Sequence, residues 1–209
     1  MPRNSSSSGT APASLDPRVV RSRAAVLGAA REILFAEGWD AVTHASVAAR
    51  SGVGRTTLYR HWPEAADLIR DVIAEQLAIT RIAPTGDLRE DLIAQLEAFR
   101  LQLHDPGMER ALRVIIERAG YLPAFTEMKE TLYQEGSRGF REILRQAKAA
   151  GEVDARLDVG RAIDQLAGPL VYRRFLAGRS FTTAYVRHVV DDFLTAHAPR
   201  DPGAGTASP

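Results

Sequence analysis

Cysteine is absent from this sequence. Its absence excludes disulfide frameworks, cysteine-type zinc fingers and thiol nucleophiles, and it fits a reducing compartment. No apolar run reaches the roughly 18 to 20 residues that span a bilayer. Serines occupy the N-terminal stretch where a signal peptide would carry its apolar segment. We therefore expect a cytoplasmic protein that is neither exported nor anchored in a membrane.

The motifs of catalytic and metal sites are also missing. The histidines form no i, i+4 pair and no His-Glu-x-x-His segment, so nothing supports a metal site. We expect each of them to be a surface or capping group; they are His44, His61, His104, His188 and His197. No Gly-x-Ser-x-Gly elbow and no phosphate loop after a strand occurs. The sequence predicts a protein that is not an enzyme and needs no cofactor.

Charge is divided unevenly along a chain of otherwise ordinary globular composition, with 45% hydrophobic and 25% charged residues. Residues 1–70 hold nine arginines and no lysine against six acidic residues, a net charge of +3. Because the whole chain carries +1, the remainder carries −2. If the protein binds a polyanion, this asymmetry indicates that it does so at the N-terminal end.

The apolar spacing is helical along nearly the whole chain. Residues 1–16 and 198–209 hold too little apolar surface to fold, so we expect two disordered tails. Between them, Asp16 can cap a first helix that begins at Pro17 and ends at Gly38. Two short segments follow on either side of Gly52-Val53-Gly54, too short to be stable unless they pack as a pair.

Six longer helices are expected after that pair. They cover 64–80, 87–104 with Asp87 and Glu90 as a capping box, about 108–119, about 124–149 ending at Gly151, 158–178 capped by Asp158, and a last one capped by Thr182. The Gly168-Pro169 pair should kink the helix that contains it. Since no alternating strand appears, the fold class is all-α.

Residues 43–62 have the spacing of a helix-turn-helix. Ala48 is small where two helices cross, Gly52 can adopt the positive φ of the turn, and Leu58 locks the second helix onto the first. The outer face of the second helix then carries Arg55, Thr56, Thr57, Tyr59, Arg60 and His61, whose donors suit the major groove and its phosphates. The alternative is a helical hairpin with a solvated polar face. We expect Trp39 and Trp62, which frame the hairpin, to be core residues.

Three runs of residues carry a family resemblance: Ala29 to Trp39, Val47 to Val53, and Thr57 to Pro63. Together they resemble the DNA-binding domain of the TetR family of transcriptional regulators. The resemblance implies a three-helix DNA-binding domain at 17–64, followed at 65–197 by a helical bundle that binds a ligand and dimerises through its last two long helices. It also implies a repressor whose homodimer leaves a palindromic operator on double-stranded DNA when a small molecule enters the bundle.

The resemblance assigns DNA contacts residue by residue. Thr43 would cap its helix and contact a phosphate, Arg55 would be a basic contact, and Thr56, Thr57, Tyr59 and His61 would face the DNA. Arg60 joins the predicted DNA-binding set from its place on the outer face of the second helix. Two positions depart from the family pattern. Gly54 stands where the family usually has a serine cap. Ala65 stands where the family often has a lysine that contacts phosphate. Without that charge, the slope of the logarithm of the DNA-binding constant against the logarithm of salt concentration (the salt slope) would fall by about one unit for each phosphate no longer neutralised. Arg18, Arg21 and Arg23 either replace that charge or form an ordinary solvated helix start.

The later helices hold candidates for an effector site. We interpret one group of apolar and aromatic residues as a ligand-binding set: Phe99, Leu103, Met108, Leu112, Ile116, Tyr121, Phe125, Met128, Tyr133 and Tyr172. The alternative is that they are packed core. The effector would be aromatic or otherwise hydrophobic. A nearby pair, Arg173 and Arg174, can complement a helix dipole or meet a ligand carboxylate.

Two apolar stripes on the last helices indicate a dimer interface, made of Leu166, Leu170, Val189, Val190 and Phe193. The competing hypothesis for the whole chain is a helical interaction protein whose hairpin packs on a protein partner. Binding through several phosphates weakens steeply with salt and apolar packing does not, so a salt titration separates the two.

Overall fold

The computed structural model describes residues 17–79 and 81–199, and every regular element in these ranges is helical. In chain order the elements are α1 (Pro17–Glu37), η1 (Trp39–Ala41), α2 (His44–Ser51), α3 (Arg55–His61), α4 (Ala65–Ile79), α5 (Leu88–His104), α6 (Pro106–Arg118), α7 (Pro123–Ala150), α8 (Val159–Val171), η2 (Tyr172–Leu176) and α9 (Thr183–Ala196). The predicted all-α class is confirmed. Asp16, the tail at 1–16 and residues 200–209 of the second tail lie outside the described residues.

Most helix ends follow from local sequence chemistry. The side chains of Thr43, Asp87 and Asp158 each accept a hydrogen bond from the backbone N–H three residues later, as predicted. The capping box predicted for Asp87 and Glu90 is only half formed, because the Asp87 N–H donates to Thr85 Oγ1 and not to the Glu90 side chain. Gly151 ends α7 in the left-handed conformation with φ 75°. Thr182 precedes α9 as expected, but its side chain makes no capping hydrogen bond, so its predicted capping role is wrong.

The helix expected over 158–178 is interrupted. The α-helix α8 stops at Val171, and the turn of π-helix η2 replaces its continuation. Pro169 lies inside α8 and has no N–H to donate to the preceding turn. Weakening of the α-helical hydrogen-bond ladder there explains the wider turn that follows.

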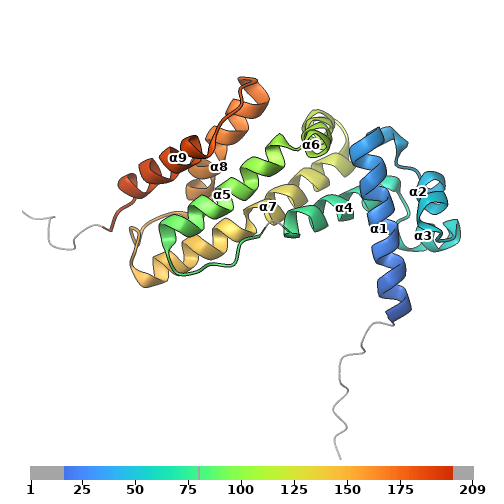
Figure 1. Ribbon diagram of the computed structural model, residues 1–209, viewed down its shortest axis with the longest axis horizontal. Helices are drawn as coiled ribbons and strands as arrows, with labels where there is room; N and C mark the ends of the chain where they lie inside the picture. The colour runs from blue at the N-terminus through green and yellow to red at the C-terminus, as the bar shows by residue number, and fades with distance from the viewer. Residues whose placement is uncertain (1–16, 80, 200–209) are drawn as a thin grey trace, which may run out of the picture.

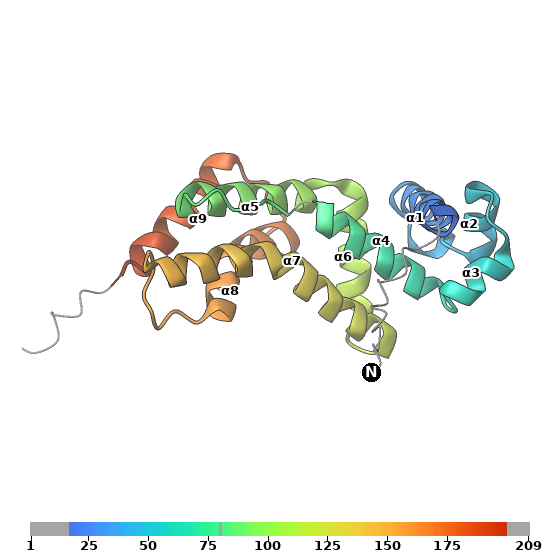
Figure 2. The ribbon, with the colours of Figure 1, turned by 90° about the horizontal axis from the view of Figure 1, so that it is seen from below.

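The molecule is elongated, with α1–α3 at one end and α8–α9 at the other (Figure 1). We call α1–α3 the head and α5–α9 the body; α4 lies between them and packs on both α1 and α7. Turned by 90°, the long helix α7 runs beneath α5 and reaches back toward the head (Figure 2). α1 also packs on α6, so both α4 and α6 hold the head against the rest of the chain.

Two hydrophobic cores follow from this arrangement. The first joins the head to α4 and continues into α6 and the start of α7, where Ile115, Phe125 and Met128 are buried. The second fills the body between α5, α7, α8 and α9. Trp62 is 3% exposed in the first core and Trp39 packs against its edge, as the sequence indicated for both.

Candidate functional site

The helix-turn-helix is built from α2 and α3. Thr43 and Ser46 cap α2 reciprocally, with Ser46 N–H donating to Thr43 Oγ1 at 3.1 Å and Thr43 N–H to Ser46 Oγ at 3.0 Å. Gly52 has φ 72°, and its N–H donates to the Ala48 carbonyl at 3.0 Å. This left-handed residue turns the chain sharply enough for α3 to begin three residues later.

α3 buries a single side chain and exposes nearly all the rest. Leu58 is fully buried and packs α3 onto the first hydrophobic core. All seven residues predicted to contact DNA lie on or beside this helix pair: Thr43, Arg55, Thr56, Tyr59, Arg60 and His61 are exposed, and Thr57 is half-buried. The structure therefore brings the whole set together on one accessible end of the molecule, where hydroxyl, guanidinium and imidazole groups can donate hydrogen bonds.

His44 supports this face from beneath, a role that the sequence did not reveal. Its ring stacks on Tyr59 at 4.0 Å between centroids, and its Nε2–H donates to the Trp62 carbonyl at 2.7 Å. His44 is only 8% exposed, so the expectation that every histidine is a surface or capping group is wrong at this position. Because the two rings belong to different helices, no local pattern could indicate their contact.

The N-terminal arginines differ in what they do. Arg23 forms an ion pair of 2.7 Å with Asp71 of α4 and lies over the Trp62 ring at 5.1 Å, so its guanidinium is engaged by the protein itself although the side chain is 51% exposed. Arg21 donates to the Pro17 carbonyl at 3.2 Å. Arg18 lines a hollow of about 230 Å³ between α1 and α3, together with Thr57, Arg60 and His61. Basic side chains of α1 and α3 therefore lie around this hollow, next to the predicted DNA-contacting residues.

A larger cavity, of about 490 Å³, lies in the body between α5, α6, α7 and α8. Seven of the ten predicted ligand-binding residues line it: Phe99, Leu103, Met108, Leu112, Ile116, Tyr133 and Tyr172. The other three do not. Phe125 and Met128 are buried in the first core, where the Phe125 ring packs at a tilt against Trp39 with 4.7 Å between the ring centroids. Tyr121 is 65% exposed on the α6–α7 connection.

The cavity wall is almost wholly apolar. Its charged lining residues are Lys129 and Asp164, which are both exposed. Its buried polar ones are Gln102 and Ser137, at 9% and 4% exposure. In the described ranges no group of acidic or histidine side chains is arranged to hold a metal ion, and no described helix is long and apolar enough to cross a bilayer.

α6 forms one wall of the cavity and touches the head with its other side. Met108, Leu112 and Ile116 recur every four residues and face the cavity. From the same helix, Arg110 donates to the Phe35 carbonyl at the end of α1. A Cβ built on Gly107 would lie 2.7 Å from that of Phe35. This close approach explains a glycine inside the first turn of α6.

An ion-pair network connects α6 to η2 beside the cavity. Glu109 accepts from Arg113 at 2.7 Å and also from Arg174. Hydrogen bonds from Arg113 hold the pKa of Glu109 below its ordinary value, opposed by partial burial and reinforced by Arg174. Arg173 instead lies over the Tyr185 ring at 4.5 Å. Arg174 therefore meets a carboxylate of the protein itself.

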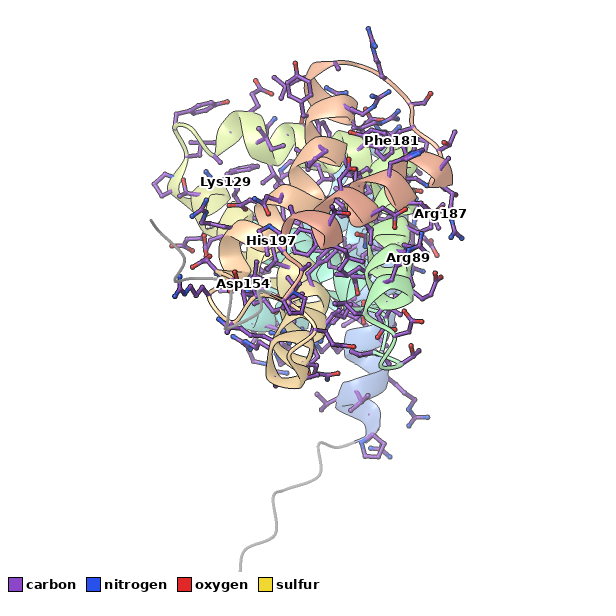
Figure 3. The ribbon with its side chains drawn as sticks, turned by 90° about the vertical axis from the view of Figure 1, so that its left-hand side faces the viewer. Arg89, Lys129, Asp154, Phe181, Arg187 and His197 are labelled. Carbon is purple, nitrogen blue, oxygen red and sulfur yellow. The ribbon has the colours of Figure 1, made fainter. Side chains whose placement is uncertain are left out.

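The predicted dimer residues lie mainly inside the chain's own core. Leu166, Leu170, Val190 and Phe193 are at most 5% exposed, and Val189 is half-buried. The opposite sides of these helices face solvent, with Arg161, Asp164 and Gln165 on α8 and Ala184, Arg187, His188, Asp192 and Thr195 on α9. Figure 3 faces this end of the molecule and labels Arg187 on α9 and Lys129 on the other flank.

Comparisons with known proteins agree along the chain. A family model described as bacterial regulatory proteins, tetR family, matches residues 26–72, and one described as tetracyclin repressor-like, C-terminal domain, matches residues 82–193. The chain is 31% identical over 176 residues to the DNA-binding transcriptional repressor TetR of Mycobacteroides abscessus, covering 82% of this chain and 90% of that protein.

Two further similarities cover most of the chain. It is 27% identical over 197 residues to the HTH-type transcriptional regulator Rv1556 of Mycobacterium tuberculosis, covering 93% of this chain and 94% of that one. The crystal structure of the TetR family transcription regulator SCO0332 has a TM-score of 0.71 at 33% identity, covering 86% of this chain and 100% of that one. All of these proteins are transcriptional regulators and none is an enzyme.

Proposed function

Because the chain belongs to the TetR family of DNA-binding transcriptional regulators, we propose that it is a cytoplasmic repressor. It binds a palindromic operator as a homodimer and is released by a small hydrophobic effector. The observation that carries the proposal is the exposure of the α3 outer face, where hydrogen-bond donors surround a helix that buries only Leu58.

The composition of that face supports sequence-specific binding. Arg55 and Arg60 can bridge a guanine edge or neutralise a phosphate, and Thr56 can touch a thymine methyl. The Tyr59 ring is held by His44, so its hydroxyl is positioned before DNA arrives. Repression rather than activation is supported by the relative from Mycobacteroides abscessus, which is named a DNA-binding transcriptional repressor.

A homodimer and a palindrome belong together, since a two-fold protein reads two symmetric half-sites. The solvent faces of α8 and α9 support this part of the proposal, because neither is covered by another described element of the chain. A four-helix contact between two copies would be made by these outer residues and not by the buried stripe.

Effector control rests on the cavity and on α6. A molecule that fills the cavity presses on Met108, Leu112 and Ile116, and the same helix contacts α1 through Gly107 and Arg110. A displacement of α6 therefore reaches the head through contacts that already exist. Changing the angle of the head in each protomer alters the separation of the two α3 helices, which an operator of fixed spacing does not tolerate.

The test begins with selection of bound fragments from the source genome. The best fragment is then footprinted and titrated at several salt concentrations. Protection of a palindrome, with log-linear weakening as salt rises, is expected for a dimer that neutralises several phosphates. Absence of enrichment over random DNA at low salt, for protein unfolded and refolded to remove any bound effector, would refute the proposal.

A further inference from the structure

The chemical class of the effector can be read from the cavity wall, given that the cavity is an effector site as proposed above. We propose that the effector is an uncharged, largely apolar molecule bearing a hydroxyl or another hydrogen-bond donor, and that Ser137 accepts that hydrogen bond.

Ser137 has an acceptor to spare. It lies in the middle of α7, lines the cavity and is 4% exposed. Its hydroxyl proton is already used, because Oγ donates to the Tyr133 carbonyl one turn earlier. Within the part of the chain that the structure describes, nothing donates to this oxygen. Its lone pairs can therefore accept from a ligand without breaking a hydrogen bond of the protein.

Charge is excluded from the interior of the cavity. Lys129 and Asp164, its charged lining residues, are exposed and of opposite sign, so they favour neither an anion nor a cation. The nearby Glu109 is already engaged by Arg113 and Arg174 and does not line the cavity. An ionised group placed against the buried part of the wall, away from Lys129 and Asp164, would lose its water without finding a counter-ion, and this disfavours its binding.

The size and composition of the wall define the rest of the molecule. A volume of about 490 Å³ lies within the range of small-molecule sites, and the lining contains Phe99, Phe140 and Phe175 together with aliphatic side chains. A single donor on an apolar skeleton fits the accepting oxygen of Ser137. Any additional donor that found no acceptor in the wall would weaken binding.

The experiment uses the full chain and three carbon skeletons: biphenyl, phenanthrene and a ten-carbon alkyl chain. Each skeleton is supplied with one of four end groups, namely hydroxyl, methyl, carboxylate and aminomethyl. Binding is measured by calorimetry and by the shift in melting temperature. On the skeleton that fits, the hydroxyl probe should bind about tenfold more tightly than the methyl probe. Both charged probes should bind about a hundredfold more weakly than the hydroxyl probe.

Substitution separates recognition from a merely structural role. Ser137→Ala should reduce the hydroxyl-to-methyl affinity ratio to about one while leaving the methyl probe's affinity unchanged. Ser180→Ala, at an exposed serine outside the cavity, should preserve the ratio. A ratio unchanged in Ser137→Ala would overturn the assignment of this residue.

The remaining outcomes distinguish this inference from the proposed function. If a carboxylate or ammonium probe binds as tightly as the hydroxyl probe, the uncharged class is wrong although the cavity still binds ligands. If no probe on any skeleton binds or releases operator DNA, both the inference and the effector-controlled part of the proposal fall. DNA binding itself would stand in either case.

Discussion

The indole N–H of Trp62 donates a hydrogen bond of 2.9 Å to the carboxylate of Asp71, and through it the end of α3 is fastened to α4. The same carboxylate oxygen accepts from Arg23 of α1 at 2.7 Å. Three helices therefore meet at one acceptor directly behind the proposed DNA-contacting face. This contact orients α3 although neither Trp62 nor Asp71 belongs to that face.

Removing only the indole N–H tests this contact. Trp62→Phe should lower the free energy of unfolding by about 1 to 3 kcal/mol, because it removes a partly buried hydrogen bond to a charged acceptor. Operator affinity should fall with it, since the end of α3 is less firmly held. Urea unfolding and operator titration measure the two effects. Trp39→Phe is the matched control, because Trp39 is tied to Phe125 by ring packing; equal losses in both variants would contradict the role of the hydrogen bond.

The outer face of α3 should carry affinity without carrying stability. Arg55→Ala and Tyr59→Phe remove exposed donors, so operator binding should weaken by about 1 to 3 kcal/mol for each hydrogen bond to a base that disappears, with no change in unfolding. Leu58→Ala should instead destabilise the head by about 2 to 5 kcal/mol.

Titration of Arg55→Ala at two salt concentrations shows whether Arg55 contacts a phosphate. If it does, its loss leaves one phosphate unneutralised and lowers the salt slope by about one unit. Unfolding of Arg55→Ala at room temperature would mean that its helix face is misassigned.

The junction between α1 and α6 should resist even a methyl group. In Gly107→Ala the new Cβ meets Phe35 at 2.7 Å, so one helix must move, at a cost of about 1 to 3 kcal/mol. Operator affinity should change as well, because α6 positions the head. Gly28→Ala is the control: its Cβ meets nothing within 4 Å, and a helical alanine should stabilise by about 1 kcal/mol. If both variants are equally stable, the two helices do not approach each other this closely.

Two substitutions distinguish the inner from the outer sides of α8 and α9. Leu166→Ala should destabilise the protomer by about 2 to 5 kcal/mol, because the side chain is fully buried within it. Ala184→Arg changes an exposed residue of α9 and should leave protomer stability nearly unaltered. It should nevertheless weaken dimerisation if the outer face forms the contact, which light scattering across a concentration series detects. A wild-type protein that scatters as a single chain at micromolar concentration would exclude the dimer.

Acidification should destabilise the start of α5, where Asp91 lies. Burial of Asp91 opposes its ionisation, but hydrogen bonds from Thr85 and Gly86 outweigh burial and lower the pKa of Asp91 below its ordinary value. A carboxyl whose pKa is lower in the folded than in the unfolded protein stabilises the fold fully above its unfolded pKa, about 4. That stabilisation disappears as the pH falls through the lowered folded value.

Asp91→Asn should therefore cost about 1 to 3 kcal/mol at pH 7 and make the loss of stability on acidification less steep. Urea titrations at pH 7 and at successively lower pH measure both. Glu90→Gln, at the exposed neighbouring position, should change neither. An unaltered acid dependence in Asp91→Asn would show that other carboxyls govern it.

Local chemistry was enough to predict the class and the head. Helical spacing, the capping oxygens of Thr43, Asp87 and Asp158, and the left-handed turn at Gly52 depend on residues only a few positions apart. The same holds for the accessible face of α3, because one buried residue on a short helix determines which side the others occupy. His44 was missed because its partner Tyr59 lies fifteen residues away on another helix.

The body shows what spacing cannot decide. Periodicity identified apolar faces that contain Met108, Leu112, Phe125 and Met128, yet the first two line a cavity and the last two fill a core. An apolar face is the same in sequence whether the helix opposite packs closely or stands apart, so burial, cavity and interface all follow from how helices cross. By itself the sequence determined most of the helices and their ends, and the outward face of α3, although it did not indicate the interruption of α8 at Val171. Only the tertiary structure decided that Leu166 and Leu170 point inward, and that α6 touches the cavity and the head at once.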